Sequence, residues 1–293
     1  MARSRLIGYY FIFPALIYMI LLVGYPIIEN IRLGFYDVNV MNISSKSQAF
    51  VGLQNYRDLF DKGTIQIAMG NTLFYTVICI VFQFTIGFGL ALFFSQKFGL
   101  SERLRGLIMV SWLMPGTITA LMFRYMFSLD GGIINSVLLR LHIIEKPIEW
   151  LIQEHNAMWS IIIANTWVGV PFNMILLTTG LITIPKDVYE SAAMDGANAI
   201  QKFFRITLPL LKPTITSLLI LGFIYTFKVF DLVVVMTNGG PVDATEMLST
   251  YSYKLSFGEF NFSQGAAVAN ILFVILFIIS LGYLKMVSKE EVM

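Results

Sequence analysis

Charged side chains are scarce in this sequence. They make up 13% of its 293 residues, and the formal net charge at pH 7 is only +2. A soluble domain of this length carries about 25% charged residues. So small a net charge also lacks the basic surface that attracts nucleic acid. We therefore expect an integral membrane protein that does not bind nucleic acid.

Residues that carry catalysis or bind metals are also rare. The single cysteine, Cys79, lies inside an apolar run, which excludes a disulfide framework or a cysteine-based metal site. The two histidines, His142 and His155, share one polar stretch and lack the spacing of metal ligands. No Gly-Lys dipeptide occurs, so there is no phosphate-binding P-loop, and neither a His-Glu-x-x-His nor a nucleophile-elbow motif is present. We expect a chain that is not an enzyme and holds no metal or cofactor.

Long apolar runs are what the sequence does contain. Hydrophobic residues make up 57% of it, and the mean hydropathy is +0.74. Six runs are long enough to cross about 30 Å of hydrocarbon, at residues 7–28, 71–95, 106–127, 158–181, 214–236 and 265–286. No repeat or interdomain linker interrupts them. We predict an all-α membrane protein with six transmembrane helices, forming a single transmembrane domain over residues 1–293.

The distribution of Lys and Arg predicts the orientation in the membrane. The loops on one side carry eleven basic residues, which are Arg3, Arg5, Lys97, Arg103, Arg105, Lys186, Lys202, Arg205, Lys212, Lys285 and Lys289. The loops on the other side are longer and carry seven, which are Arg32, Lys46, Arg57, Lys62, Arg140, Lys146 and Lys254. We therefore expect both termini, and the loop between the fourth and fifth segments, to be cytoplasmic.

That cytoplasmic loop, residues 185–213, has the pattern of a short helical hairpin. Pro185 suits the first turn of a helix, and Gly196 can adopt the left-handed conformation that ends one. A second helix is predicted from about Ala197 to Thr207, after which prolines redirect the chain into the membrane. The side chains of the first helix are too small to fill a core, so its surface is suited to being held by another protein.

The hairpin resembles the EAA loop in the membrane subunits of binding-protein-dependent ABC importers. The pattern there is Glu-Ala-Ala, three residues, Gly, nine residues, Ile-x-Leu-Pro, and the spacing here is the same, with Ser191 in place of the first alanine. The resemblance implies the type I importer permease fold and contact with a cytoplasmic ATPase through these residues: Glu190, Ser191, Ala192, Ala193, Asp195, Gly196, Ile206, Leu208 and Pro209.

Two polar and aromatic stretches are predicted to lie at the same depth in the membrane. At a helical rise of about 1.5 Å per residue, the middle of the fourth segment falls within residues 165–173 and that of the fifth within 222–231. Pro171 frees the carbonyl of Trp167, which must then face protein or a water-filled cavity rather than lipid. Gln83 in the second segment lies near the same depth.

Lys228 and Asp231 are three residues apart, so they are predicted to share one face of the fifth helix. A charge at this depth costs about 2.5–3.5 kcal/mol unless it is paired or hydrated. Two readings fit that cost. The residues could neutralise each other and stabilise the helix, or they could form a cavity wall that contacts the hydroxyl groups of a solute.

The same two stretches contain side chains that suit a sugar. Aromatic rings stack on the C–H face of a pyranose, while amides and hydroxyls bind its hydroxyl groups; the candidates are Asn165, Gly169, Phe172, Tyr225 and Thr226. Small and polar residues also occur where membrane helices pack against each other. Residue chemistry alone leaves both explanations open.

A wider resemblance bears on that choice. The runs Trp167–Phe172, Leu181–Gly196, Thr237–Thr245 and Asp130–Asn135 look like those of maltose-type carbohydrate permeases, specifically the first-type subunit of a heteromeric pair. In the maltose-specific member, the sugar site draws on positions that match Asn165, Val168, Gly169, Phe172, Gly222, Tyr225, Thr226 and Val229. Thr226 and Val229 replace asparagines there, so the particular sugar is not implied.

The resemblance also implies a set of partners in the plasma membrane of a bacterium or archaeon. They are a second homologous permease subunit, two copies of an ATPase that bind ATP and Mg, an extracytoplasmic solute-binding protein, and the surrounding lipid. The expected function is half of the path for an imported sugar. The alternatives are an importer of glycerol-phosphate or another polar solute, and an ion-coupled secondary transporter.

Overall fold

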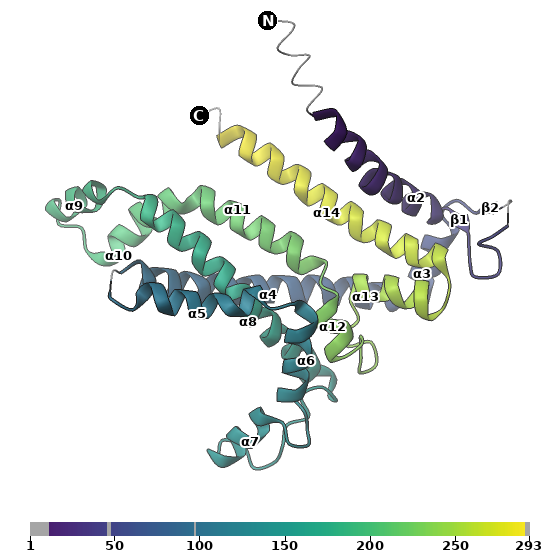
Figure 1. Cartoon of the computed structure of the whole chain (residues 1–293), viewed down its shortest axis with the longest axis horizontal. Helices are drawn as coiled ribbons and strands as arrows, with labels where there is room; N and C mark the ends of the chain where they lie inside the picture. The colour runs from purple at the N-terminus through teal and green to yellow at the C-terminus, as the bar shows by residue number, and fades with distance from the viewer. Residues whose placement is uncertain (1–11, 46–47, 97, 291–293) are drawn as a thin grey trace, which may run out of the picture. The chain divides into compact units, whose positions relative to one another are not determined.

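The computed structural model describes residues 12–45, 48–96 and 98–290, and these are mostly helical (Figure 1). The chain forms two compact units. One comprises residues 1–66 and 251–277, and the other residues 67–250 and 278–293. Helices α4, α13 and α14 each contribute residues to both units.

The first unit contains a long apolar helix and a small polar cap. Its elements are the helix Ile12–Leu33, which includes the π-helical turn η1 (Ile20–Gly24) and α2 (Tyr25–Leu33), then β1 (Tyr36–Asp37), β2 (Ala49–Phe50), α3 (Gln54–Lys62), the π-helical turn η3 (Lys254–Gly258) and most of α14 (Phe262–Glu290). The two strands are antiparallel. Asn30 Nδ2 donates to Asn270 Oδ1 at 2.8 Å, and Asn270 Nδ2 to the Tyr56 hydroxyl at 3.0 Å. These bonds join α2, α3 and α14.

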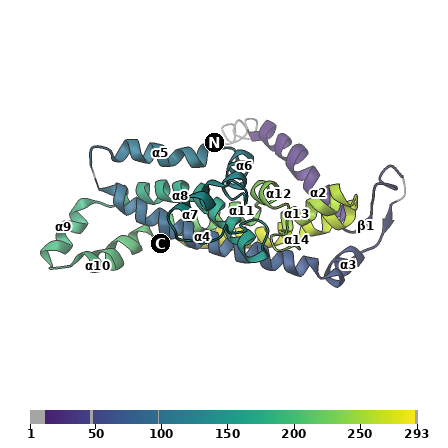
Figure 2. The same cartoon turned by 90° about the horizontal axis from the view of Figure 1, so that it is seen from below.

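The second unit holds the remaining helices. They are α4 (Thr64–Ser95), α5 (Ser101–Leu113), α6 (Gly116–Met126), α7 (Ile133–Arg140), α8 (Glu154–Thr183), α9 (Lys186–Met194), α10 (Ala199–Lys202), the π-helical turn η2 (Phe203–Thr207), α11 (Leu208–Phe227), α12 (Asp231–Met236) and α13 (Leu248–Tyr253). Helices α4, α5, α8 and α11 run beside one another, and α9 and α10 project from one end of this group (Figures 1 and 2).

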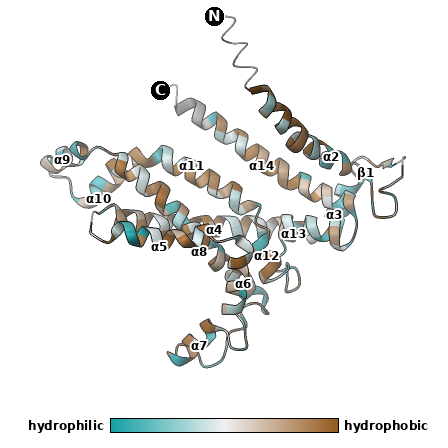
Figure 3. Cartoon of the chain, in the orientation of Figure 1, coloured by the Kyte–Doolittle hydropathy of each residue, from teal (hydrophilic) through white to brown (hydrophobic). Residues whose placement is uncertain are grey.

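Five helices of the described residues are long and apolar enough to cross a membrane: Ile12–Leu33, Thr64–Ser95, Glu154–Thr183, Ala199–Phe227 and Phe262–Lys285. Figure 3 shows the apolar residues along them. Helices α5 and α6 together make a sixth candidate, bent by 95°. The prediction of an all-α membrane protein is therefore confirmed at the level of the fold, with five or six candidate spans in the described residues. Residues 7–11 of the first predicted segment lie outside the described residues.

The bend corrects the prediction of one continuous helix over residues 106–127. Pro115 has no N–H to donate and clashes with a helical residue before it, so Met114 is extended at φ −72° and ψ 136°. Helix α5 ends at Leu113 and α6 begins at Gly116. Apolar length alone predicted a single span because it took no account of the proline.

The fifth predicted segment, residues 214–236, is also broken. Helix α11 ends at Phe227, and α12 begins only at Asp231. The Ser249 hydroxyl donates to the carbonyl of Val229, a residue between the two helices. A carbonyl that the break frees is therefore bonded by a side chain of α13, as backbone at membrane depth requires.

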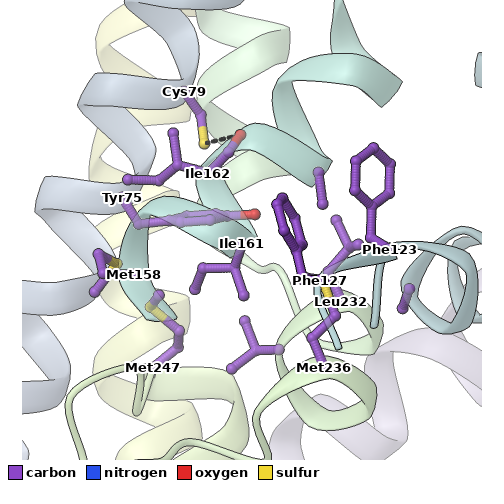
Figure 4. Packing of buried hydrophobic residues seen from close by; sticks show 13 residues of the cluster. Tyr75, Cys79, Phe123, Phe127, Met158, Ile161, Ile162, Leu232, Met236 and Met247 are labelled. Carbon is purple, nitrogen blue, oxygen red and sulfur yellow. Dashed lines mark hydrogen bonds between the residues drawn. The ribbon is translucent and has the colours of Figure 1, made fainter. Parts of the chain in front are cut away.

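Two apolar clusters fill the second unit. One joins α4, α6, α8 and α12 through Tyr75, Cys79, Ala120, Phe123, Phe127, Met158, Ile161, Ile162, Ala164, Leu232, Val233, Met236 and Met247 (Figure 4). The other joins α4, α8 and α11 through Phe88, Ala91, Leu177, Ile184, Leu211 and Leu218. The first cluster holds the two short helices that follow the breaks, and the second holds the long helices that lead to α9 and α10.

Candidate functional site

The predicted hairpin between α8 and α11 is present, and its first helix ends as the sequence indicates. Gly196 has a φ of +77°. Its N–H donates to the carbonyl of Ala193 at 3.0 Å, and the N–H of Ala197 donates to the carbonyl of Ala192 at 2.9 Å. This pair of bonds is the Schellman arrangement, in which a left-handed glycine satisfies the last carbonyls of a helix. Pro185 is the residue that precedes the first turn of α9.

The second helix of the hairpin starts with a reciprocal cap. Asn198 Oδ1 accepts from the N–H of Gln201, and Gln201 Oε1 accepts from the N–H of Asn198, both at 2.9 Å. The predicted end at Thr207 is wrong, because the helix passes through η2 into α11 without a break up to Phe227. Pro209 lies inside this continuous helix, directly after η2, and does not end it, because local π-helical adjustments allow prolines in membrane helices.

The hairpin is tied to itself and to the spans. The Tyr189 hydroxyl on α9 lies 2.9 Å from Thr207 Oγ1 in η2. Tyr189, Phe203 and Leu208 pack against the cluster shared by α4, α8 and α11. The hairpin is therefore packed against the long helices as well as bonded to itself.

The predicted coupling residues fall mainly on the outer surface of this hairpin. Glu190, Ser191, Ala193, Asp195, Gly196 and Pro209 are exposed, while Ala192, Ile206 and Leu208 are half-buried. Three large apolar residues beside them were not predicted as part of this surface. Met194 is 90% exposed, Ile200 69% and Phe204 61%. The hairpin thus presents apolar side chains as well as small ones.

A cavity of about 540 Å³ lies between α4, α5, α8 and α11. Its walls are Gln83, Trp112, Asn165, Val168, Gly169, Phe172, Asn173, Leu221, Gly222, Tyr225 and Thr226. The volume is within the range of about 300–1,000 Å³ typical of small-molecule sites. The structure therefore brings together the two stretches predicted to lie at one depth, together with Gln83.

Gly169 leaves room for the side chain that joins α4 to α8 at this cavity. Gln83 Nε2 donates to the carbonyl of Asn165 at 3.0 Å. A Cβ atom on Gly169 would lie 2.2 Å from Gln83 Cδ, which is far inside van der Waals contact. The buried amide of Gln83 occupies the space where a side chain at position 169 would be, so a larger residue there would displace that amide. Asn173 Nδ2 donates in turn to the carbonyl of Gly169 at 2.9 Å.

Two aromatic rings from different helices form another part of the wall. Trp112 on α5 stacks on Phe172 on α8, with the ring centroids 5.7 Å apart and the planes 25° from parallel. Trp112 is 45% exposed. Trp112 was not predicted as a cavity residue, because the predicted span around it is apolar throughout. Its place two residues before the Met114–Pro115 bend was the available signal.

Three of the predicted path residues are not among the cavity walls. Val229 packs against the apolar cluster of α4, α6, α8 and α12. Lys228 lies over the ring of Tyr225, with its Nζ 5.4 Å from the ring centroid. Asp231 lies against the first residue of α6, since a Cβ atom on Gly116 would be 3.2 Å from Asp231 Oδ2.

The prediction that Lys228 and Asp231 share a helix face is therefore wrong. The backbone leaves the helix between them, at Lys228–Phe230. Within the part of the chain that the structure describes, they form no ion pair with each other. Asp231 instead places a carboxylate beside the N-terminus of α6, and the guanidinium of Arg124 donates to the carbonyl of Val235 near the end of α12 at 3.1 Å. Both contacts complement helix dipoles.

A second cavity, of about 650 Å³, lies beside the bend between α5 and α6. Trp167 and Pro171 contribute to its walls, which are almost wholly apolar. This cavity is separate from the first in its lining residues and has few polar groups. It is the less suited of the two to a hydroxylated solute.

The comparisons with known proteins all point to one family of transport proteins. A family model described as "Binding-protein-dependent transport system inner membrane component" matches residues 83–287. The sulfoquinovosyl glycerol transport system permease protein SmoG of Agrobacterium fabrum is 30% identical over 98% of this chain and 92% of its own length. The trehalose/maltose transport system permease protein MalF of Thermococcus litoralis is also 30% identical, over 97% and 94%.

The structural comparison supports the same fold. A chain from a bacterial ABC transporter involved in the import of the acidic polysaccharide alginate superposes with a TM-score of 0.82 over 98% of this chain and 96% of that one. The sequence identity is 22%, so this likeness concerns the arrangement of the helices.

Proposed function

This chain belongs to the inner-membrane components of binding-protein-dependent transport systems, and from that membership we propose that it is one membrane-spanning subunit of an ATP-driven sugar importer. Two relatives of similar length carry names that refer to sugar transport systems, for sulfoquinovosyl glycerol and for trehalose and maltose. A third, named as part of a diacetylchitobiose uptake system in Streptomyces coelicolor, is 28% identical over 99% of this chain.

One observation carries the proposal: the cavity and the cytoplasmic hairpin share the same two helices. Helix α8 contributes Asn165, Gly169 and Phe172 to the cavity and continues at its far end into α9. Helix α11 contributes Gly222 and Tyr225 and is continuous with α10 through η2. A force on the hairpin is therefore applied to both walls of the cavity.

The partners proposed from this arrangement divide the work. Two cytoplasmic ATPases bind ATP and Mg, and one of them holds the small-residue surface at Glu190–Gly196 and the apolar side chains Met194, Ile200 and Phe204. A second, homologous permease subunit closes the open side of the cavity. An extracytoplasmic binding protein delivers the sugar to the opposite face. In this proposal ATP is bound and hydrolysed by those ATPases and not by this chain.

The orientation follows from the basic residues of the loops. The hairpin and both termini are on the cytoplasmic side of a bacterial or archaeal plasma membrane. A glycerol-phosphate importer is the second candidate within this family. A secondary transporter is the third, but such transporters place ionisable groups at the substrate site, and no charged residue lines this cavity.

Uptake by the complete transporter in proteoliposomes tests the proposal. We expect import of a labelled sugar that requires internal ATP and the binding protein and that persists when a protonophore collapses the proton gradient. Uptake that stops with the protonophore and continues without ATP would contradict the proposed importer. Uptake of glycerol-phosphate in preference to any sugar would favour the second candidate.

A further inference from the structure

The cavity between α8 and α11 has no formal charge on its walls. Its polar groups are the amides of Gln83, Asn165 and Asn173 and the hydroxyls of Thr226 and Tyr225. A carboxylate, phosphate or sulfonate moved into it from water would have no cation among these walls to offset its lost hydration. Amides and hydroxyls bind uncharged hydroxyl groups without such a penalty.

Two charged side chains follow the part of α11 that lines the cavity. The ammonium of Lys228 lies over the Tyr225 ring, and the carboxylate of Asp231 lies beside the N-terminus of α6. Neither is part of the cavity wall. The groups that this chain contributes to the cavity wall are therefore uncharged.

Trp112 supplies a broad apolar surface at the edge of this neutral site. Phe172 covers part of its indole ring, in a stack with centroids 5.7 Å apart, while 45% of the residue is left exposed. The electron-rich faces of an aromatic ring attract the weakly positive C–H groups of a pyranose. Trp112 lies in the last turn of α5, next to the Met114–Pro115 bend, so its position depends on the bend.

From these observations, and resting on the proposed function, we propose that the cavity selects uncharged sugars and that Trp112 is the residue on which the sugar ring stacks. Phe172 supports the indole from behind. Tyr225, which is 62% exposed in the cavity wall, then presents its hydroxyl to the hydroxyl groups at the edge of the ring.

Equilibrium binding to the purified complete transporter, without its binding protein, tests this inference. The probes are the neutral sugars maltose, trehalose and diacetylchitobiose and an acidic alginate trisaccharide. We expect the transported neutral sugar to bind and the acidic one to bind at least about tenfold more weakly. Trp112→Leu should weaken binding of the neutral sugar about two- to tenfold, and Trp112→Phe should restore most of the loss.

Two control variants make the result specific. Trp167→Leu removes the same side chain from the second cavity and should leave the dissociation constant unchanged. Lys228→Gln should change it less than about twofold, whereas an anionic cargo held by Lys228 would lose most of its affinity. The inference is overturned if Trp112→Leu has no effect, if Trp167→Leu has an equal one, or if the acidic sugar binds as tightly as the neutral one.

Uptake measured on the same preparations separates this inference from the proposed function. A wild-type complex that imports no sugar of either kind contradicts the proposed function. A complex that imports a neutral sugar is consistent with the proposed function. If that complex binds the sugar independently of Trp112, or binds none of it in the absence of the binding protein, only this inference is contradicted.

Discussion

At the scale of single residues, the cavity wall depends on Gly169, which has no side chain. Gly169 has no Cβ atom, and the amide of Gln83 fills that space and reaches the carbonyl of Asn165 on the neighbouring turn of α8. A glycine in the middle of a helix costs about 0.5–1 kcal/mol relative to alanine. Here that cost is offset by a buried hydrogen bond between two spans.

Gly169→Ala should therefore weaken both the fold and the sugar site. The added methyl group forces the amide of Gln83 away from Asn165, and such overpacking costs about 1–3 kcal/mol. We expect a lower thermal unfolding midpoint of the purified complex and weaker sugar binding. Gly89→Ala on α4 is the matched control, since no atom lies within 4 Å of its added Cβ. Equal midpoints and affinities in the two variants would contradict this account of Gly169.

Residue chemistry predicted most of the cavity walls but not all of them. Asn165, Gly169 and Phe172 recur on one side of a helix, and Tyr225 and Thr226 lie at a matching depth, so helical spacing is enough to place them together. Trp112 could not be found in this way. It reaches the cavity because α5 packs on α8, and that packing is a tertiary contact which no pattern within α5 indicates.

At the scale of helices, the end of α9 sets the shape of the cytoplasmic hairpin. Gly196 adopts a left-handed φ of +77° and accommodates the turn into α10. Asparagine tolerates this conformation far better than a β-branched residue does. The backbone requirement at Gly196 can therefore be separated from a requirement for small size.

Gly196→Val should abolish transport while leaving membrane insertion intact, because strain at this turn displaces α9. ATP hydrolysis should continue without sugar uptake. Gly196→Asn should retain uptake if only the backbone conformation matters, and should lose it if the ATPase also contacts this position. The measurements are uptake and ATPase rate in proteoliposomes. Normal uptake in Gly196→Val would contradict the coupling role of the hairpin.

The sequence was enough to predict that these helices form, but not where two of them are interrupted. The long apolar runs predicted six spans, but the bend at Pro115 and the break after Phe227 were both read as continuous helix. The converse error occurred at Pro209, where a predicted stop is helical. Pro115 interrupts its helix, whereas Pro209 directly follows a π-helical turn within a continuous one, so the effect of a proline depends on the turn that precedes it.

The two short helices after these breaks are joined to each other. Asp231 begins α12 and lies beside Gly116 at the start of α6, and Arg124 on α6 bonds the carbonyl of Val235 on α12. Both helices contribute to the same apolar cluster (Figure 4). Lys228 and Asp231 therefore lie at the break between α11 and α12, and neither is among the residues that line the cavity.

At the scale of the whole molecule, the proposed role of the α9–α10 hairpin is to carry movement of an ATPase to the cavity within the membrane. The hairpin has one covalent connection to each of the two helices that form the cavity, and Tyr189 holds it closed through Thr207. From the family membership we predict that an ATPase binds this hairpin. No pattern in the sequence identifies that ATPase, the second permease subunit or the individual sugar, because each depends on a surface of another chain.

Cross-linking from the hairpin tests the central claim most directly. Cys79 is the only cysteine of the chain and is buried, so Ala193→Cys introduces a single accessible thiol for a photoreactive label. Leu141→Cys, exposed after α7, is the control on the side predicted to be extracytoplasmic. We predict that illumination of the intact complex in membranes joins the Ala193→Cys variant, and not the Leu141→Cys variant, to an ATP-hydrolysing subunit. Failure of the Ala193 label to capture that subunit, or its capture from Leu141, would contradict the account.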